Sequence, residues 1–196
     1  LKIYRQAVLQ RAFEGKLTKN ENRNMSLVRL EEVCDFITKG TTPAKKDLFQ
    51  GSGDLPFIKV YNLTFRGHLD FAIDPTFVSR TTHNTVLARS KVLPGDVLMN
   101  IVGPPLGKVA IVPNRFPEWN INQAIARFRC KKVLFNKFLT HYLMSSTTVE
   151  KIKSKSKATA GQFNLTLEIC RDIELLLPSL SDQHQIVAEI ESRLSV

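Results

Sequence analysis

Apolar side chains recur every three or four residues at both ends of the chain, which is the spacing of one face of an α-helix. The first such segment covers residues 1–13 and precedes Gly15, a residue type that commonly ends helices; the second begins after Ser179, whose hydroxyl can cap a helix. Each is only about a dozen residues long, near the lower limit for an isolated helix, so each needs a partner surface. The spacing leaves open whether that surface is the central core or a longer coiled coil. The positions expected to form this helix interface are Tyr4, Val8, Ile186, Val187, Ile190 and Leu194.

Between these helices, short apolar runs are bounded by Gly and Pro, a pattern typical of strands. Strands are predicted at 55–60, 96–102, 108–112, 123–130 and 172–177, and helices at 134–144 and 149–152. This order predicts an α+β fold, with a mixed or antiparallel sheet and helices concentrated after most of the strands. The expected organisation is a helical segment at 1–18, a polar Asn-rich linker at 19–25, one globular domain at 26–178 and a terminal helix at 179–196.

Positive charge is concentrated in the middle of the chain. The sequence holds 28 Lys and Arg against 18 Asp and Glu, which gives a net charge of +10 and a pI near 9.7. Residues 80–157 alone carry 14 basic side chains and 3 acidic ones. A positive field of this kind favours a polyanionic partner, and we expect that partner to be double-stranded DNA.

Two further features bear on the compartment. The three cysteines are widely spaced and odd in number, so they suggest neither a disulfide framework nor a metal clip. Apolar runs long enough to span a membrane are absent. We therefore expect a protein of the reducing cytoplasm with no membrane partner.

Motifs for catalysis or for a cofactor are weak. The tract at 103–108 resembles a phosphate-binding loop, but only three residues separate its glycines and Val109 follows the Lys, so a turn between strands is the better interpretation. The four histidines lack metal-ligand spacing, and the basic segment lacks the clustered carboxylates that hold nuclease metals. These observations favour a binder without its own cofactor. A stand-alone nuclease or methyltransferase fragment, or an RNA-binding protein, remains an alternative.

Candidate binding residues lie in polar segments rich in hydrogen-bond donors. Lys, Thr and backbone N–H groups can hold phosphates, whereas Arg, Asn and Gln can read base edges. The predicted DNA-binding residues are Lys39, Thr41, Thr42, Lys45, Lys46, Arg80, Thr82, His83, Asn84, Arg89, Lys91, Asn120, Asn122, Lys153, Lys155, Lys157 and Gln162.

Two terminal motifs carry a resemblance to a known family. Residues 4–18 resemble the end, and residues 177–191 the start, of conserved helical regions in the specificity (S) subunits of type I restriction-modification enzymes. Between them, the tracts at 40–43, 93–98, 103–109, 122–124 and 161–165 occur in the order seen in the target recognition domains of that family. The resemblance covers nearly the whole chain.

The resemblance implies a DNA-reading protein that performs no chemistry itself. In that family each recognition domain reads one half of a bipartite DNA site, and the helices form a coiled coil. Modification subunits then methylate adenine with S-adenosylmethionine, and restriction subunits add ATP- and Mg-dependent cleavage. This chain has one recognition domain where two are usual. We therefore expect either a fragment of a two-domain subunit or a half-subunit that forms a homodimer.

Overall fold

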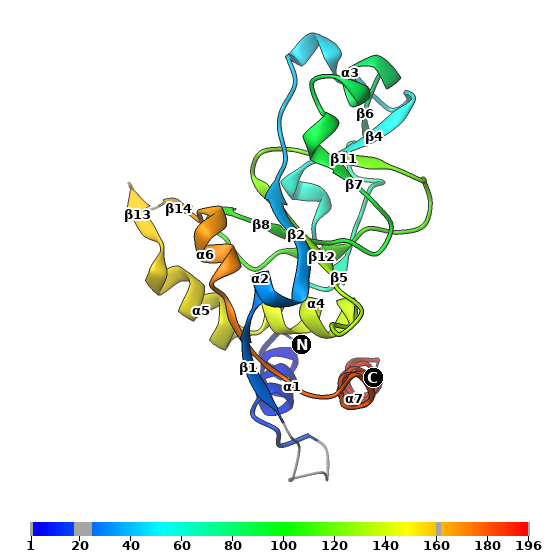
Figure 1. Ribbon diagram of the computed structural model, residues 1–196. Helices are drawn as coiled ribbons and strands as arrows, with labels where there is room; N and C mark the ends of the chain where they lie inside the picture. The colour runs from blue at the N-terminus through cyan, green and yellow to red at the C-terminus, as the bar shows by residue number, and fades with distance from the viewer. Residues whose placement is uncertain (1, 18–24, 160–161, 196) are drawn as a thin grey trace.

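The computed structural model describes residues 2–17, 25–159 and 162–195, and its centre is a five-stranded sheet (Figure 1). Helices lie against one face of this sheet and a second sheet lies against the other. The order of strands in the central sheet is β2 (Cys34–Lys39), β12 (Ile125–Cys130), β8 (Val97–Asn100), β10 (Val109–Ile111) and β5 (Gly67–His68). The pairing of β5 with β10 is parallel and the other pairings are antiparallel, so the sheet is mixed.

Strand β12 shows how sequence alternation separates the two faces of the central sheet. Ala126 and Phe128 belong to the core that includes the helices, whereas Ile125 belongs to the core shared with the second sheet. Alternate residues of a strand point to opposite faces, so Arg127 and Arg129 share the face of Ile125. That face is apolar at one end and basic at the other.

The second sheet surrounds the aromatic core of the upper lobe in Figure 1. Its strand order is β3 (Phe49–Gln50), β6 (Thr76–Val78), β4 (Leu55–Ile58), β11 (Trp119–Ile121) and β7 (Lys91–Val92). The Trp119 ring is fully buried and meets Phe71 and Phe116 edge-on, with ring centroids 5.2 and 5.0 Å apart. Edge-on contacts of this kind add to the apolar burial that holds the lobe together.

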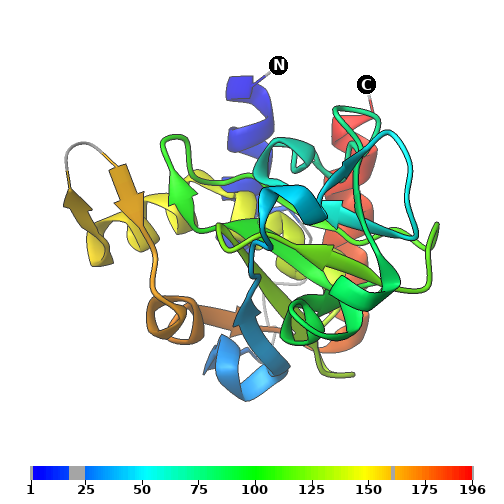
Figure 2. The same ribbon diagram turned by 90° about the horizontal axis from the view of Figure 1, so that it is seen from above.

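Four helices cover the other face of the central sheet: α1 (Lys2–Phe13), α4 (Asn136–Met144), α5 (Ser146–Lys155) and α7 (Leu180–Leu194). Helix α1 ends where Gly15 adopts a φ of 75°, and Ser179 caps α7 by accepting a hydrogen bond from the Asp182 N–H at 3.2 Å. Helices α1 and α7 contact each other and run in opposite directions, so the N- and C-termini lie at the same end of the pair (Figure 2). Among the described residues, no helix could cross a membrane.

Smaller elements complete the body. A two-stranded ribbon pairs β1 (Ser26–Arg29) with β15 (Glu174–Leu177). A three-stranded arm, seen at the left of Figure 1, pairs β13 (Lys157–Thr159), β14 (Gln162–Asn164) and β9 (Val102–Gly103). The short helices are α2 (Leu30–Val33), α3 (Arg80–Asn84), α6 (Leu167–Arg171) and the 3-10 turns at Lys45–Asp47, Val60–Asn62 and Ala88–Ser90.

The α+β class, the mixed sheet and both terminal helices are confirmed. Strands or helices occur within every predicted segment, and the tract at 103–108 connects β9 to β10 as predicted. No strand was predicted at β1, β2, β3, β5, β6, β7, β11, β13 or β14. Most of these strands are only two to four residues long, which is too short for a periodic signal. The proposed linker at 19–25 falls almost entirely outside the described residues.

Most of the residues predicted for the helix interface pack inside this chain. Val8, Ile186, Val187 and Ile190 are buried in one core with the central sheet, and Leu194 packs half-buried against it. Tyr4, by contrast, is 51% exposed and takes no part in this core, whereas Leu9 on the same helix is fully buried. Both helices therefore dock on the central core.

Candidate nucleic-acid interface

The first candidate surface joins two predicted segments, 39–46 and 120–123. The Thr41 N–H donates to the Ile121 carbonyl at 3.2 Å, and the Thr42 hydroxyl donates to the Gln123 side chain. Gly40 makes this approach possible, because a Cβ atom there would lie 2.1 Å from the Ile121 carbonyl oxygen. The close packing holds Thr41 and Thr42 at the surface.

Other predicted residues flank this loop pair. Lys39 is exposed at the end of β2, and Lys45 and Lys46 are exposed on a 3-10 turn. Asn122 is half-buried, and its side-chain oxygen accepts a hydrogen bond from the Ala124 N–H at 3.2 Å. Exposed cations beside fixed hydroxyls form a surface suited to phosphate contacts.

The second candidate surface surrounds α3, where three residues predicted to contact DNA are buried. These residues, Thr82, His83 and Asn120, are only 8%, 1% and 0% exposed. The His83 ring lies 2.6 Å from the Asn120 side-chain oxygen through Nδ1 and 3.1 Å from Glu118 through Nε2. Thr82 packs at the capped start of α3, where its N–H donates to the Ser79 hydroxyl. These polar groups join α3 to β11 and are not accessible to a duplex in this structure.

Four predicted residues remain at the surface near α3. Arg80, Asn84 and Arg89 are exposed and Lys91 is half-buried. The Lys91 ammonium donates to the Asn84 side-chain oxygen at 2.7 Å and lies 3.8 Å from Glu118. This arrangement holds an amide and several cations on one side of the upper lobe.

The third candidate surface is the end of α5 together with the adjoining arm, which lies apart from α3 in Figure 1. The Lys153 ammonium pairs with Glu150 at 2.8 Å and lies 5.9 Å from the centroid of the Phe163 ring, while Lys155 is exposed. Lys157 and Gln162 lie in β13 and β14, and their side chains are outside the described residues. The predicted residues that stay exposed therefore fall in three regions of the fold, whereas Thr82, His83 and Asn120 are buried.

A cluster of side chains on β2 and β12 was not predicted from the sequence. Phe36 pairs in register with Arg129, and the guanidinium carbons of Arg127 and Arg129 each lie 5.5 Å from its ring centroid. Arg129 makes two 2.8 Å hydrogen bonds to the carboxylate of Asp96. Arg127 and Arg129 alternate along a predicted strand, so the sequence indicates that they share one face of the sheet. Phe36 lies in a segment for which no strand was predicted, so its place beside them could not be inferred.

The electrostatics of this cluster differ between its two arginines. Hydrogen bonding to Asp96 raises the pKa of Arg129. Burial lowers the pKa of Arg127, although Asp96 acts in the opposite direction. Arginine remains protonated in proteins, so both side chains contribute positive charge to this surface.

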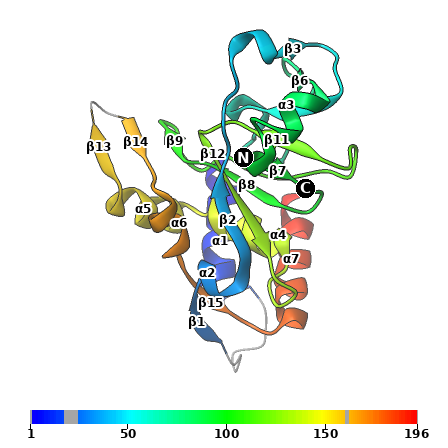
Figure 3. The same cartoon turned by 45° about the horizontal axis from the view of Figure 1, so that its top comes forward.

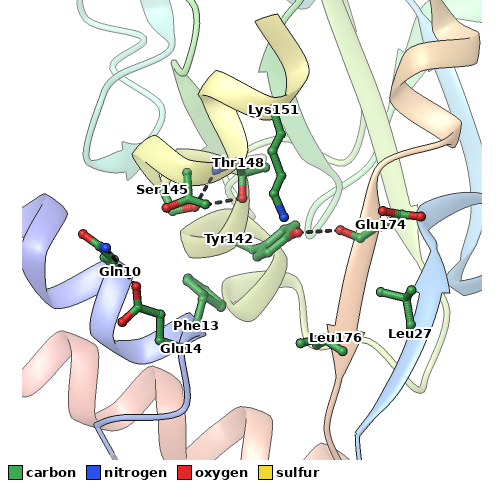
Figure 4. A pocket seen from close by; sticks show the side chains of 11 residues that line it. Gln10, Phe13, Glu14, Leu27, Tyr142, Ser145, Thr148, Lys151, Glu174 and Leu176 are labelled. Atoms are coloured by element: carbon green, nitrogen blue, oxygen red, sulfur yellow. Dashed lines mark hydrogen bonds between the residues drawn. The ribbon is translucent and has the colours of Figure 1, made fainter. Parts of the chain in front are cut away.

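One apolar cavity lies away from these surfaces, between α1, α4 and the β1–β15 ribbon (Figure 4). It has a volume of about 230 Å³ and is lined by side chains that include Phe13, Leu27 and Tyr142. The Tyr142 hydroxyl donates to the Glu174 carbonyl at 2.5 Å, and Ser145 bonds Thr148 at the start of α5. These polar groups serve the local structure, so the cavity offers no arrangement for nucleophilic catalysis. In the described part of the chain, no cluster of His, Cys, Asp or Glu could hold a metal.

The domain has two stacked sheets with basic loops, and its paired terminal helices lie on the opposite face of the central sheet. This arrangement is that of a candidate nucleic-acid-binding module. The family model for the type I restriction modification DNA specificity domain matches residues 22–192, and the chain belongs to this family.

Comparisons with individual proteins agree with this membership. The chain is 26% identical to the type I restriction enzyme EcoBI specificity subunit of Escherichia coli, over 97% of this chain and 43% of that protein. Its fold matches the HsdS subunit of Thermoanaerobacter tengcongensis with a TM-score of 0.68 and 19% identity, over 99% of this chain and 43% of the other. A chain from a type I R-M system, solved to explain complex assembly and conformational transition, matches with a TM-score of 0.67 and 20% identity, over 97% and 45% of the two chains. The present chain thus spans less than half the length of these relatives.

Proposed function

We propose that this chain recognises a specific sequence of double-stranded DNA, one half of a bipartite site, for a type I restriction-modification system. The observation that carries the proposal is the concentration of 14 basic side chains against 3 acidic ones in residues 80–157, inside the domain that the family model matches. In this view the chain itself is not catalytic. Partner modification subunits would methylate adenine with S-adenosylmethionine, and restriction subunits would use ATP and Mg.

Two kinds of contact would divide the work of recognition. Lys39, Lys45, Lys46 and Lys155 are exposed cations that can pair with phosphates, which supply affinity and a strong salt dependence. The exposed Asn84 amide can make paired hydrogen bonds to a base edge, which contribute about 1–3 kcal/mol of discrimination at each good contact.

The terminal helices would supply the spacing between two half-sites. Helices α1 and α7 would continue into a coiled coil that joins this domain to a second recognition domain or to a second copy. Joining two weak readers raises the effective concentration of the second reader once the first has bound. This provides a physical reason for carrying a DNA-reading domain on paired helices.

The test is to express the chain with its modification subunits and sequence the methylated adenines in the host DNA. We expect one bipartite motif, and we expect Asn84→Ala to reduce methylation of that motif or relax one base position. Lys137→Ala is the control, because Lys137 pairs with Glu191 on α7, 3.0 Å away, outside the three candidate surfaces. Methylation or cutting by the purified chain alone, with Mg and S-adenosylmethionine, would support the stand-alone enzyme instead.

A further inference from the structure

An exposed aromatic ring on β2 stands beside two fixed guanidinium groups. Phe36 is 50% exposed, whereas Phe57 and Phe128 are almost completely buried. Arg127 and Arg129 each place a guanidinium carbon 5.5 Å from the Phe36 ring centroid. We call these three side chains the Phe36 platform, and Figure 3 shows its strands, β2 and β12, next to β7.

The arginines of the platform are held in place by groups behind them. Asp96 is 3% exposed and binds Arg129 through both carboxylate oxygens at 2.8 Å. Arg127 is 9% exposed and donates to the backbone carbonyl of Lys91. The Nε atom of Arg127 is buried and has no hydrogen-bond partner. Side chains fixed in this way lose little freedom when a ligand binds.

The surroundings of the platform carry an excess of positive charge. Toward α3, the Lys91 ammonium bonds Asn84. Toward α7, a cavity of about 520 Å³ is lined by Arg129, Lys132 and His184 among others. The acidic groups nearby are Asp35, Asp96 and Glu118, of which Asp96 is bonded to Arg129 and Glu118 lies close to Lys91 and His83. A surface of this composition complements a polyanion.

We propose that the Phe36 platform is a DNA-contacting element, in which Phe36 makes an apolar contact with a base while the surrounding cations lie along the phosphates. This inference rests on the proposed function. Phe has no hydrogen-bonding group, so it can recognise a base only through apolar surface, such as a thymine methyl or the face of a base at an opened step. Phe36 then contributes affinity for particular sequences, whereas its cationic neighbours bind all sequences alike.

The test uses the complex of the chain with its modification subunits and a labelled duplex that carries the methylated motif of the wild-type system. Affinity is measured by fluorescence anisotropy over a series of salt concentrations. We expect Phe36→Ala to weaken binding of the motif duplex about tenfold, the scale of one base–aromatic contact. Binding of an unrelated duplex and the slope of affinity against salt should stay unchanged, because no charge is removed.

Two further variants sharpen the result. Phe49→Ala is the matched control, because Phe49 is 45% exposed on β3 and removal of its ring should leave DNA binding unchanged. Phe36→Leu keeps apolar surface but removes the ring, so it should bind with intermediate affinity. Urea unfolding of each variant checks that the domain remains folded.

Three outcomes would overturn the inference. If Phe36→Ala binds the motif duplex as tightly as the wild type, Phe36 does not contact a base. If the Phe36→Ala variant no longer binds the modification subunits, but the variant chain alone binds DNA as the wild-type chain does, the platform is a protein interface. If the wild-type complex fails to distinguish the motif duplex from other DNA, the proposed function itself fails, and this is seen before any variant is compared.

Discussion

Burial determines what a polar side chain can do in this protein. His83 belongs to a polar sequence that suggests an exposed reading loop, yet it is 1% exposed and its two ring nitrogens contact Asn120 and Glu118. A buried polar group must find hydrogen-bond partners inside the protein. His83 is therefore committed to joining α3 to β11, while the neighbouring Asn84 stays exposed.

The stability of the protein should depend on pH through His141. Its side chain is 9% exposed on α4, where it faces Arg5, Lys137 and Glu191. Burial, aided by the cations Arg5 and Lys137 and opposed by Glu191, lowers its pKa to about 4. Between the ordinary value near 6.5 and 4, the unfolded chain binds a proton that the folded chain does not. The contribution of His141 to stability is therefore complete above its ordinary pKa and is lost as the pH decreases. At pH 5 the loss is about 2 kcal/mol of unfolding free energy.

The measurement is the free energy of unfolding in urea at pH 7.5 and pH 5. We expect His141→Leu to lose most of this pH-dependent difference. His68→Leu is the control, because His68 is exposed, and this variant should keep the pH-dependent difference in unfolding free energy. A wild-type protein that is equally stable at both pH values, or a His141→Leu variant with an unchanged difference, would contradict this prediction.

At the scale of elements, short strands position the candidate surfaces. The arm exists because β14 pairs with both β13 and β9, with Phe163 opposite Gly103 in the register. The basic side chains of this surface begin on α5, where the Lys153 ammonium lies 5.9 Å from the centroid of the Phe163 ring. The arm and the α3 region present positive charge from different parts of the fold, so their contributions to DNA binding can be measured separately.

The contribution of the arm should appear in the salt dependence of binding. We expect Lys153→Ala combined with Lys155→Ala to reduce the log–log slope of affinity against salt by up to about 2, since each neutralised phosphate contributes about 0.9. The methylated motif should stay the same, because phosphate contacts carry no sequence information directly. Lys137→Ala is again the control. An unchanged slope would mean that Lys153 and Lys155 do not touch the duplex.

At the scale of the whole molecule, the two terminal helices lie on the side of the central sheet opposite the upper lobe (Figure 1). Their buried faces are already occupied by the core of this chain, yet Ile3 and Tyr4 on α1 remain 87% and 51% exposed. Exposed apolar residues beside each other are a feature of association surfaces. The helix pair is therefore the place where we expect a second copy or a second recognition domain to attach.

If two copies assemble there, their two-fold symmetry must be imposed on the DNA site. We expect the methylated motif to be an inverted repeat of one half-site, and light scattering to show dimers of the purified chain. Ile3→Ser with Tyr4→Ser should shift the protein to monomers while its fold is retained. Ile73→Ser is the control, since Ile73 is 50% exposed but lies outside α1. An asymmetric motif would instead indicate a second, different recognition domain.

The helices at both ends, several strands, the α+β class and the basic centre of the chain could be predicted from the order of residues. That order also carried the resemblance to the family, which the match over residues 22–192 confirms. These features depend on local periodicity, composition and motif order, which can be read without knowing which segments meet.

Which polar and aromatic residues face the solvent depends on how distant segments pack in three dimensions. His83 meets Asn120 across 37 residues of sequence, and Arg129 meets Asp96 across 33. Phe36 lies on the same face of the central sheet as Ile125. The second sheet covers this face at Ile125 but not at Phe36, where the neighbouring side chains are arginines, so Phe36 stays exposed. Burial is set by contacts between distant segments, so the sequence pattern alone could not separate the residues that support the surface from those that form it.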